Sequence, residues 1–127
     1  CKAINGLPIT LRQNRRFSYL YIDDLMPILE HFIENDAKYK SYNIVPSKNV
    51  ELLEIAKIVR EISQKDIEIK VANDGYGLDY TGDNSRLLEE IPNCHFTDIK
   101  DSIKRLYDYY VKNNNHMINK NLLLVDK

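Results

Sequence analysis

The chain has 127 residues, and its 18 Lys and Arg against 19 Asp and Glu leave a formal net charge of −1. This length fits one domain, and 43% hydrophobic with 29% charged residues is a globular rather than a disordered composition. The balanced charge argues against a dedicated nucleic-acid binder and against a polybasic membrane module. No apolar run approaches the ~18 residues that a membrane span needs.

The two cysteines, Cys1 and Cys94, form neither a disulfide framework nor a metal-binding spacing, so we expect a reduced, cytoplasmic setting. Residues 1–5 predict the last turn of a helix, which Gly6 would end as a left-handed residue. Because the sequence also lacks an initiator Met, we interpret it as a piece that begins inside an element. A processed, mature N-terminus is the alternative.

Two strands open the predicted order of elements. Residues 8–11 are short, apolar and partly β-branched, and residues 17–22 are aromatic and β-prone. The side-chain alternation of a strand puts Phe17, Tyr19 and Tyr21 on one face of the second strand.

An amphipathic helix is predicted next, from a stripe at helical spacing that comprises Leu25, Ile28, Leu29 and Phe32. Pro27 constrains its start, because a proline has no N–H to donate inside a helix. With Asp24 as the N-cap, Pro27 falls in the first turn, where its missing N–H is not needed. We therefore predict that Asp24 caps the helix and that Asp23 lies at the end of the preceding strand with no capping role.

The rest of the chain predicts two further strands, three further helices and one long loop. In chain order these are a strand at 42–45, a helix with its stripe over 52–62, a strand at 67–71, a glycine-punctuated loop at 73–83, a short helix at 85–91 capped by Asp83 or Asn84, and a last helix from 99 capped by Thr97 or Asp98 and ending at 113–115. The fold class is α/β, a small β-sheet with about four helices. Residues 1–112 form the domain, and 113–127 are expected to be a tail.

Several common catalytic and cofactor motifs are absent from the sequence. It has no Gly-x-Gly-x-x-Gly, no Walker A run and no Gly-x-Ser-x-Gly elbow. Three scattered histidines predict no metal centre. Cys94 and His95 are adjacent, and neighbours on an extended chain point apart, so a thiolate–imidazole pair is not expected.

Charged residues around the second strand are the first candidates for a binding site. Arg15 and Arg16 could grip an anionic ligand, because guanidinium groups form paired hydrogen bonds to phosphate oxygens. An ordinary charged strand end is the alternative. Asp23 could serve acid–base chemistry or only a structural hydrogen bond.

The loop at 73–83 supplies the second group of candidates. Its polar and aromatic side chains are Asp74, Tyr76, Asp79, Tyr80 and Asp83. Long loops of this kind often form the rim of a ligand site. Arg86 follows in the first helical turn, where the helix dipole mildly disfavours a cation; this indicates either a functional role or a salt bridge to Glu90.

Five segments in one order resemble a known family: residues 5–11, 17–25, 42–44, 52–56 and 82–86. Together they are similar to the C-terminal, substrate-binding half of the extended short-chain dehydrogenases/reductases, the NAD-dependent nucleotide-sugar epimerases and dehydratases. The resemblance covers about residues 1–112.

The resemblance implies a Rossmann domain upstream, which would hold NAD or NADP and a catalytic Tyr-x-x-x-Lys pair. No Tyr of this sequence is followed by Lys four residues later. We therefore expect a region that binds a nucleotide-diphosphate sugar, has no cofactor of its own and is not catalytic alone. A non-catalytic interaction or regulatory module that reuses this half-fold is the alternative, and a stand-alone α/β protein is a third reading. Without its partner domain, the chain would tend to self-associate through an exposed face bearing Tyr19 and Tyr21.

Alignment on residues 21–24 places the family's diphosphate-gripping Arg on Phe17. Arg15 shares the strand face of Phe17 and could substitute. The family's second Arg falls near Asn73, whereas Arg86 falls on a family Lys. The expected substrate-binding residues are Arg15, Arg16, Asp23, Tyr80, Asp83 and Arg86. Of these, Arg15, Asp23 and the segment near Tyr80 are expected to surround a common hollow.

Overall fold

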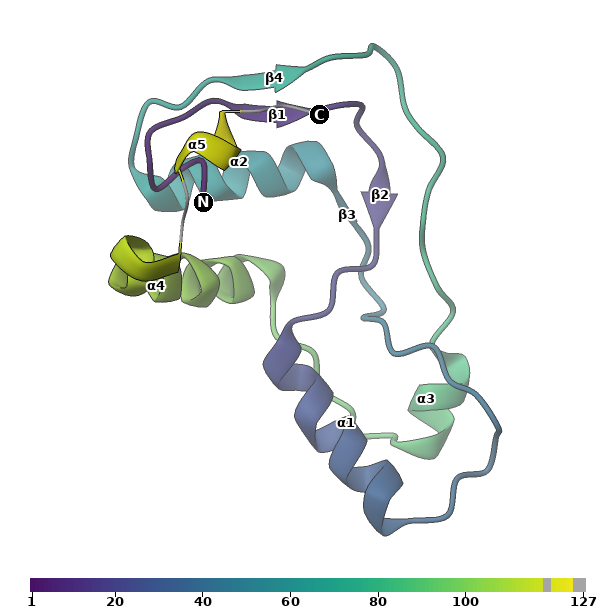
Figure 1. Cartoon of the computed structure of the whole chain (residues 1–127). Coiled ribbons are helices and arrows are strands. Elements are labelled where there is room, and N and C mark those ends of the chain that lie inside the picture. Colours follow the sequence, from purple (N-terminus) through teal and green to yellow (C-terminus); the bar gives the residue numbers. More distant parts are fainter. Residues whose placement is uncertain (118–119, 125–127) are drawn as a thin grey trace.

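The computed structural model describes residues 1–117 and 120–124 (Figure 1). Within them lie five helices and four short strands. In chain order these are β1 (Ile9–Leu11), β2 (Arg16–Phe17), α1 (Ile22–Glu34), β3 (Val50–Glu51), α2 (Leu52–Ser63), β4 (Ile69–Val71), α3 (Ser85–Glu90), α4 (Ile99–Met117) and α5 (Lys120–Leu123). The α/β class is confirmed, with small sheets and one more helix than the sequence predicts.

The strands form two two-stranded sheets rather than the one predicted sheet. β1 pairs with β4 in parallel, with Ile9 opposite Ile69, and β2 pairs with β3 in antiparallel register, with Arg16 opposite Glu51. Figure 1 shows β1 and β4 on one side of α2, with α4 on the other side. The β1–β4 pair, α2 and α4 therefore form the layered end of the molecule.

The layered end has its own small core. α2 presents an apolar stripe because its hydrophobic residues recur at helical spacing, and Ala56 in that stripe is buried. Ala3 and Ile67 are buried as well. α2 ends at Gln64, whose φ of 53° is the left-handed conformation usual at helix ends.

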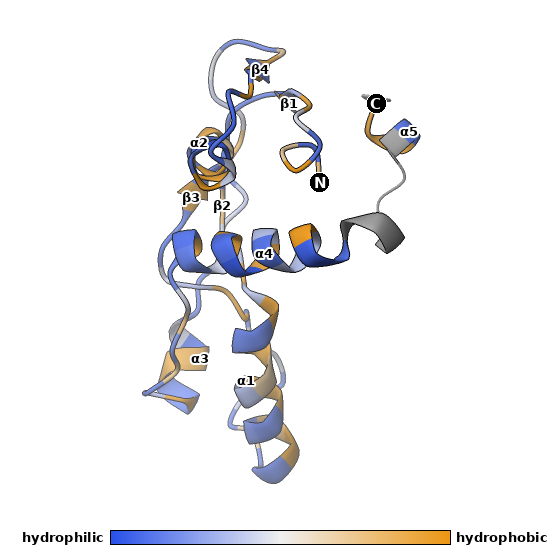
Figure 2. Ribbon diagram, turned by 90° about the vertical axis from the view of Figure 1, so that its left-hand side faces the viewer, coloured by the Kyte–Doolittle hydropathy of each residue, from blue (hydrophilic) through white to orange (hydrophobic). Residues whose placement is uncertain are grey.

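α1 and α3 form an arm that extends away from the layered end (Figures 1 and 2). Ile28 of α1 and Leu87 of α3 are buried, and His31 Nε2 lies 3.5 Å from a carboxylate oxygen of Glu90. Figure 2 shows hydrophobic residues on more than one side of α1.

The predicted start of α1 is wrong. The helix begins at Ile22, its N-cap is Tyr21 without a side-chain capping bond, and Asp24 lies in the first turn. The Asp24 carboxylate instead accepts hydrogen bonds from the backbone N–H (2.8 Å) and hydroxyl (2.6 Å) of Thr97. The Asp24 carboxylate oxygens therefore bind Thr97, 73 residues later in the sequence, instead of capping the N–H groups at the start of α1. Pro27 consequently lies inside the helix, so it cannot donate to the Asp23 carbonyl.

The strand predictions hold only where a partner strand is present. Residues 8–11 and 67–71 are confirmed in their central parts as β1 and β4. In the predicted strand at 17–22 only Phe17 is paired, and α1 has already begun at Ile22. Residues 42–45 form no strand: no described backbone group pairs with their N–H groups, and Val45 O accepts from the Asn84 side chain (2.9 Å).

The N-terminal residues form a turn, and the C-terminal part of the chain is more helical than predicted. Asn5 N donates to Cys1 O, and Gly6 has a φ of 67°, so the predicted N-terminal turn is confirmed. Asp98 Oδ1 accepts from Lys100 N, which identifies Asp98 as the capping residue of α4. α4 continues to Met117, beyond its predicted end, and α5 follows within the predicted tail. Positions 118–119 and 125–127 of that tail lie outside the described residues, and the boundary at 112 stays a prediction.

Candidate functional site

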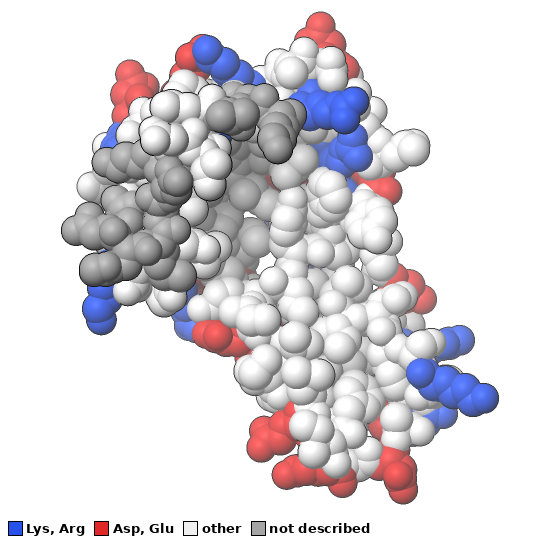
Figure 3. Space-filling model, viewed as in Figure 1, with Lys and Arg blue, Asp and Glu red and all other residues white. Residues whose placement is uncertain are grey.

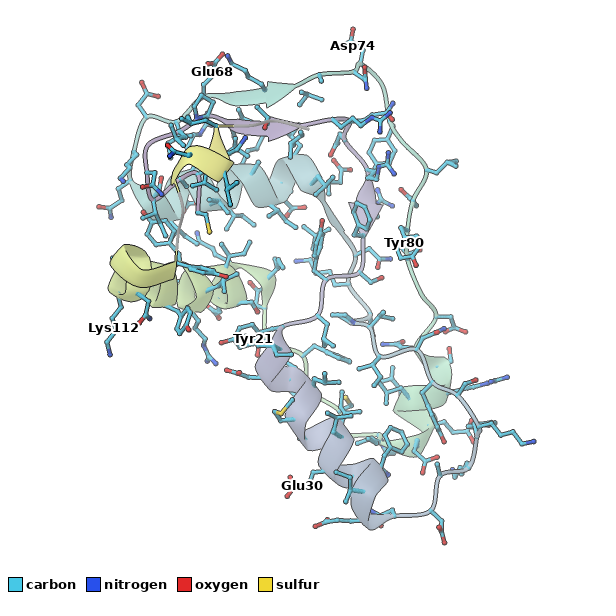
Figure 4. The ribbon with its side chains drawn as sticks, in the orientation of Figure 1. Tyr21, Glu30, Glu68, Asp74, Tyr80 and Lys112 are labelled. Carbon is cyan, nitrogen blue, oxygen red and sulfur yellow. The ribbon has the colours of Figure 1, made fainter. Side chains whose placement is uncertain are left out.

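The predicted loop at 73–83 is in large part an extended strap that runs beside β2. We use "strap" for residues 76–82. Gly77 N donates to Asn14 O (2.8 Å), and Tyr80 N donates to Arg16 O (2.9 Å), in parallel bridges. These bonds place Tyr80 next to the candidate arginines, which are more than 60 positions earlier in the sequence. Figure 4 shows Tyr80 on the strap, beside β2.

Asn14 fixes the position of the candidate arginines relative to α2. Its side-chain oxygen accepts from Leu53 N (3.0 Å), and Arg15 O accepts from Leu52 N (3.0 Å), so two of the free N–H groups at the start of α2 are capped. The Asn14 side-chain amide also donates to Glu51 Oε2 (2.9 Å). This bond is the main cause of the lowered pKa of Glu51.

The Arg16 side chain connects β2 to β3 and to the strap. Its guanidinium lies 3.6 Å from Glu51 and 4.0 Å from Asp79, so two carboxylates neutralise it. The phenol of Tyr76 and the carboxylates of Asp79 and Glu51 raise its pKa. Binding an external anion would compete with both carboxylates, which makes Arg16 the weaker of the two candidate arginines.

Arg15 is half-buried under the strap, and no described residue forms an ion pair or hydrogen bond with its side chain. Gly77 crosses it closely: a Cβ at this position would lie 3.0 Å from Arg15 Nε and 3.0 Å from Gln13 Oε1. With any larger residue at this position, the Arg15 and Gln13 side chains would have to shift by a few tenths of an ångström. Arg15 is therefore a positioned cation with no charge partner in the described chain.

A hollow of about 440 Å³ lies beside the strap. Its lining comprises Ser18, Tyr42, Asn43, Ile44, Val45, Tyr80, Thr81 and Gly82. The Tyr80 ring is 77% exposed, with its centroid 6.0 Å from that of Phe17. The Ser18 hydroxyl accepts from Gly82 N (3.3 Å), which anchors the strap at this edge. The hollow thus combines hydroxyl and amide groups with an aromatic wall, a lining suited to a polar ligand that also has a flat ring.

Asp83 and Arg86 follow the strap at the start of α3. Asp83 Oδ1 accepts from Ser85 N (3.0 Å), and its bonds with the Ser85 hydroxyl and amide lower its pKa. Of the two predicted caps, Asp83 is thus the one that accepts from the helix, whereas the Asn84 side chain donates to Val45 O and Ser47 Oγ. The Arg86 guanidinium lies 5.0 Å from the Tyr39 ring centroid, so this cation stacks on an aromatic ring.

The expectation that Arg15, Asp23 and the segment near Tyr80 share one hollow is wrong. Asp23 lies in the first turn of α1 and lines a separate hollow of about 260 Å³, together with Cys94 and His95. Arg15 lines neither hollow. α1 begins at Ile22, so Asp23 belongs to the first turn of this helix rather than to the end of the segment that contains β2. Figure 4 shows the same separation, with Tyr21 at the start of α1 and Tyr80 on the strap.

Sequence reasoning missed the hollow-lining residues of the 42–45 segment, although their strand-like pattern could have drawn attention to them. It also expected the face of Tyr19 and Tyr21 to be exposed, and both are half-buried. Tyr19 lines a hollow of about 380 Å³, and the Arg105 guanidinium lies 5.9 Å from the Tyr21 ring centroid. Burial raises the pKa of Tyr19. Self-association itself stays a prediction.

Among the described residues, no three His, Cys, Asp or Glu side chains gather closely enough to hold a metal ion. None of the described helices is both long and apolar enough to cross a bilayer. Burial raises the pKa of Cys94, so its thiol is not activated as a thiolate.

Comparison with known proteins gives matches among solved structures. Two structures of UDP-glucuronic acid 4-epimerase from Bacillus cereus match, one in complex with NAD and one in complex with UDP-glucuronic acid and NAD. The first has a TM-score of 0.68 at 19% identity, over 88% of this chain and 36% of that one. The second has a TM-score of 0.69 at 20% identity, over 89% and 38%. The chain has the fold of part of such an epimerase.

This epimerase is an extended short-chain dehydrogenase/reductase, so the fold-level part of the sequence resemblance is confirmed. The chain spans little more than a third of the length of the epimerase structures it matches. No family model and no curated protein sequence matches the chain. At 19–20% identity the likeness extends to the fold alone.

Proposed function

We propose that this chain is the substrate-binding part of an NAD(P)-dependent nucleotide-sugar epimerase, dehydratase or reductase. In this proposal it holds a nucleotide-diphosphate sugar and leaves the hydride transfer to a cofactor-binding part elsewhere. The observation that carries it is the fold likeness over 88–89% of the chain to about a third of an epimerase. Its role is to position the substrate, which lowers the entropic part of the barrier.

The residues of this chain do not fit a dinucleotide cofactor. The sequence has neither the glycine-rich phosphate loop nor a Tyr followed by Lys four residues later. We therefore derive no redox step from these residues, and NAD or NADP belongs to the other part of the proposed enzyme.

Arg15 is the group that we assign to the diphosphate. It is preferred over Arg16 because its guanidinium has no carboxylate partner among the described residues, whereas Arg16 faces two. A guanidinium binds phosphate oxygens through two parallel hydrogen bonds, which fixes orientation as well as position. The aromatic wall at Tyr80 would flank a ring of the ligand, and Arg15, which does not line that hollow, would meet the diphosphate beyond its edge. Asp83 and Arg86 lie further along the segment that contains Tyr80.

The test is a calorimetric titration of the chain with UDP-glucuronic acid, UDP-glucose and UDP. We expect binding of all three, weakened about tenfold or more by Arg15→Ala, which corresponds to about 1.4 kcal/mol. Arg12→Ala is the matched control. Arg12 is an exposed cation three residues before Arg15, and only its backbone carbonyl forms a hydrogen bond, with Asn73 N.

Two results would contradict the proposal. Absence of binding by any of the three nucleotides would favour the alternative, a non-catalytic interaction module that reuses this half-fold. Turnover of a nucleotide sugar by the purified chain with NAD would show that the redox residues do not lie elsewhere.

A further inference from the structure

A carboxylate and an imidazole meet between the last turn of α1 and the end of α3. The Glu90 side chain is only 7% exposed, and its Oε1 lies 3.5 Å from His31 Nε2. This ring nitrogen is buried, and no described residue forms a hydrogen bond with it. A nearly buried carboxylate is costly unless charges or hydrogen bonds compensate its oxygens. The contact between the two side chains is therefore incomplete as long as the imidazole is neutral.

The other oxygen of Glu90 holds the segment that follows α1. Glu90 Oε2 accepts hydrogen bonds from the Tyr42 hydroxyl (2.7 Å) and from Lys38 N (3.1 Å). The Tyr42 hydroxyl in turn accepts from Tyr39 N (2.9 Å), so it both donates and accepts within the chain. The Tyr42 ring packs against Phe32 of α1, with 4.6 Å between the ring centroids. Glu90 and Phe32 together thus fix the position of the Tyr42 ring.

Tyr42 is also part of the candidate site. It lines the hollow of about 440 Å³ beside the strap, together with its neighbour Asn43 and with Tyr80. Glu90 does not line this hollow, so an effect of Glu90 on a ligand there must pass through Tyr42. The structure therefore links the contact between α1 and α3 to one wall of the hollow.

The other charged groups around this contact lie at the surface. Lys38 Nζ pairs with Glu89 (3.6 Å), the Tyr39 hydroxyl donates to Glu89 (2.7 Å), and the Arg86 guanidinium lies over the Tyr39 ring. Lys38 and Arg86 are exposed, and Figure 3 shows basic and acidic groups at the surface of the arm. Water screens exposed cations, so they compensate a nearly buried carboxylate less than a protonated His31 does.

We propose that Glu90 is a positioning residue for the Tyr42 wall of the hollow, and that protonation of His31 strengthens this positioning. An imidazole protonated on both nitrogens presents an N–H and a positive charge to Glu90, whereas a neutral ring with its proton on Nδ1 presents a lone pair. Protonation also places a cation in the last turn of α1, where the helix dipole favours it. The inference rests on the proposed function, because it takes the hollow to hold a nucleotide sugar.

The direction of the pH dependence follows from the charges. A histidine is the side chain that ordinarily changes charge between about pH 5 and 8. Glu90 stays ionised in this range, because the hydrogen bond from Tyr42 is the main cause that lowers the pKa of Glu90. As the pH rises, His31 loses its proton, the attraction to Glu90 is lost and Tyr42 is less constrained. We therefore expect a ligand in contact with Tyr42 to bind more tightly at the acidic end of the range.

The first test needs no ligand and uses heteronuclear NMR of the full chain. We follow the Lys38 amide, which donates to Glu90, and the His31 ring as the pH is varied. Both should change along one curve, and the Lys38 amide should lose this dependence in His31→Gln and in Glu90→Gln. His95→Gln is the matched control, because His95 is exposed and precedes α4. A Lys38 amide that depends on pH in His31→Gln as it does in the parent would overturn the proposal.

The second test is calorimetric titration with UDP-glucose, whose phosphate charges do not change over this pH range. We expect an affinity at least about threefold higher at about pH 5.5 than at about pH 8, and no such difference in His31→Gln. Glu90→Gln should weaken binding several-fold at the lower pH. Glu89→Gln is the matched control, since Glu89 is exposed on the same helix, and it should leave the affinity within about twofold. Circular dichroism at both pH values shows whether the variants are folded.

The outcomes separate this inference from the function on which it rests. A pH difference that persists in His31→Gln, or a Glu90→Gln variant that binds like the parent at the lower pH, would overturn the inference and leave the proposed function standing. Absence of binding at both pH values would contradict the proposed function, and the Lys38 amide would then decide separately whether His31 acts through Glu90.

Discussion

Asp23 and Asp24 are adjacent carboxylates with opposite surroundings, and this contrast gives a sharp prediction. Asp24 is buried and accepts two hydrogen bonds from Thr97, at 2.8 and 2.6 Å, whereas Asp23 is exposed. Asp24→Ala removes the acceptor for both donors and separates the start of α1 from the segment that leads into α4. Asp23→Ala removes a charge near the helix N-terminus and an exposed side-chain hydrogen bond with Tyr21.

The magnitude follows from the two hydrogen bonds. A hydrogen bond to a charged group contributes about 1.5–3 kcal/mol, and in the variant water can replace part of it because Thr97 is half-buried. We therefore expect Asp24→Ala to lower the free energy of unfolding by about 2–4 kcal/mol, out of about 5–15 kcal/mol for a domain of this size. Asp23→Ala, through the helix dipole and an exposed hydrogen bond with Tyr21, should cost only about 1 kcal/mol.

The assay is equilibrium unfolding in urea, with Asp24→Asn as an intermediate variant that keeps one acceptor oxygen. A double-mutant cycle with Thr97→Val isolates the hydroxyl bond, and we expect a coupling energy of about 1 kcal/mol. If Asp24→Ala and Asp23→Ala prove equally mild, the bridge to Thr97 does not stabilise the fold and the reasoning fails.

Three further outcomes are expected. Gly77→Ala should weaken nucleotide-sugar binding several-fold in the same titration, because its Cβ would lie 3.0 Å from Arg15 Nε and displace the guanidinium; unchanged affinity would contradict this. Leu87→Ala should lower the free energy of unfolding by about 2–5 kcal/mol, since the side chain is fully buried, and a urea midpoint equal to that of the parent would refute it. The Tyr42 hydroxyl holds the pKa of Glu90 below its ordinary value, so this carboxylate stabilises the fold above its unfolded pKa of about 4.3, and the stabilisation is lost as the pH falls through the lower, folded pKa. Tyr42→Phe should reduce that acid-side loss in unfolding curves across the range, and identical pH profiles would argue against the bond.

The sequence patterns predicted the elements that local periodicity determines. α2 lies where the apolar stripe of 52–62 indicated it, and α3 lies within the predicted 85–91. These helices form because their hydrophobic spacing agrees with the face that the fold buries. The left-handed Gly6 was predictable for a similar reason, since its role is local.

The errors arose where a distant segment decides the local structure. Thr97 takes the oxygens of Asp24, which a single-sequence argument assigned to a helix cap. Residues 42–45 have the composition of a strand but lack a partner in the described chain, and a strand needs its ladder. The strap beside β2 has the composition of a loop, yet backbone pairing with Asn14 and Arg16 holds it extended.

The candidate site was predictable by residue type rather than by arrangement. Arg15 and Tyr80 were both selected from the sequence, and the pairing of the strap with β2 places Tyr80 opposite Phe17, two positions after Arg15. Their relation to Asp23 depended on where α1 begins, and a shift of that start redirected Asp23 to another hollow. The pairing of Arg16 with two carboxylates could not be predicted from the sequence either, because Glu51 and Asp79 are distant from Arg16 along the chain.

The start of α2 is capped by residues that precede it by almost 40 positions, and this constrains the order in which the chain acquires its structure. Until the segment of Asn14 and Arg15 contacts α2, the first N–H groups of this helix have only water as acceptor. Closing a loop of this length costs chain entropy before the contact returns any free energy. We therefore expect the contact between the segment of Asn14 and Arg15 and α2 to limit the rate of refolding. The refolding time should then be milliseconds to seconds, rather than the microseconds of a simple helical bundle.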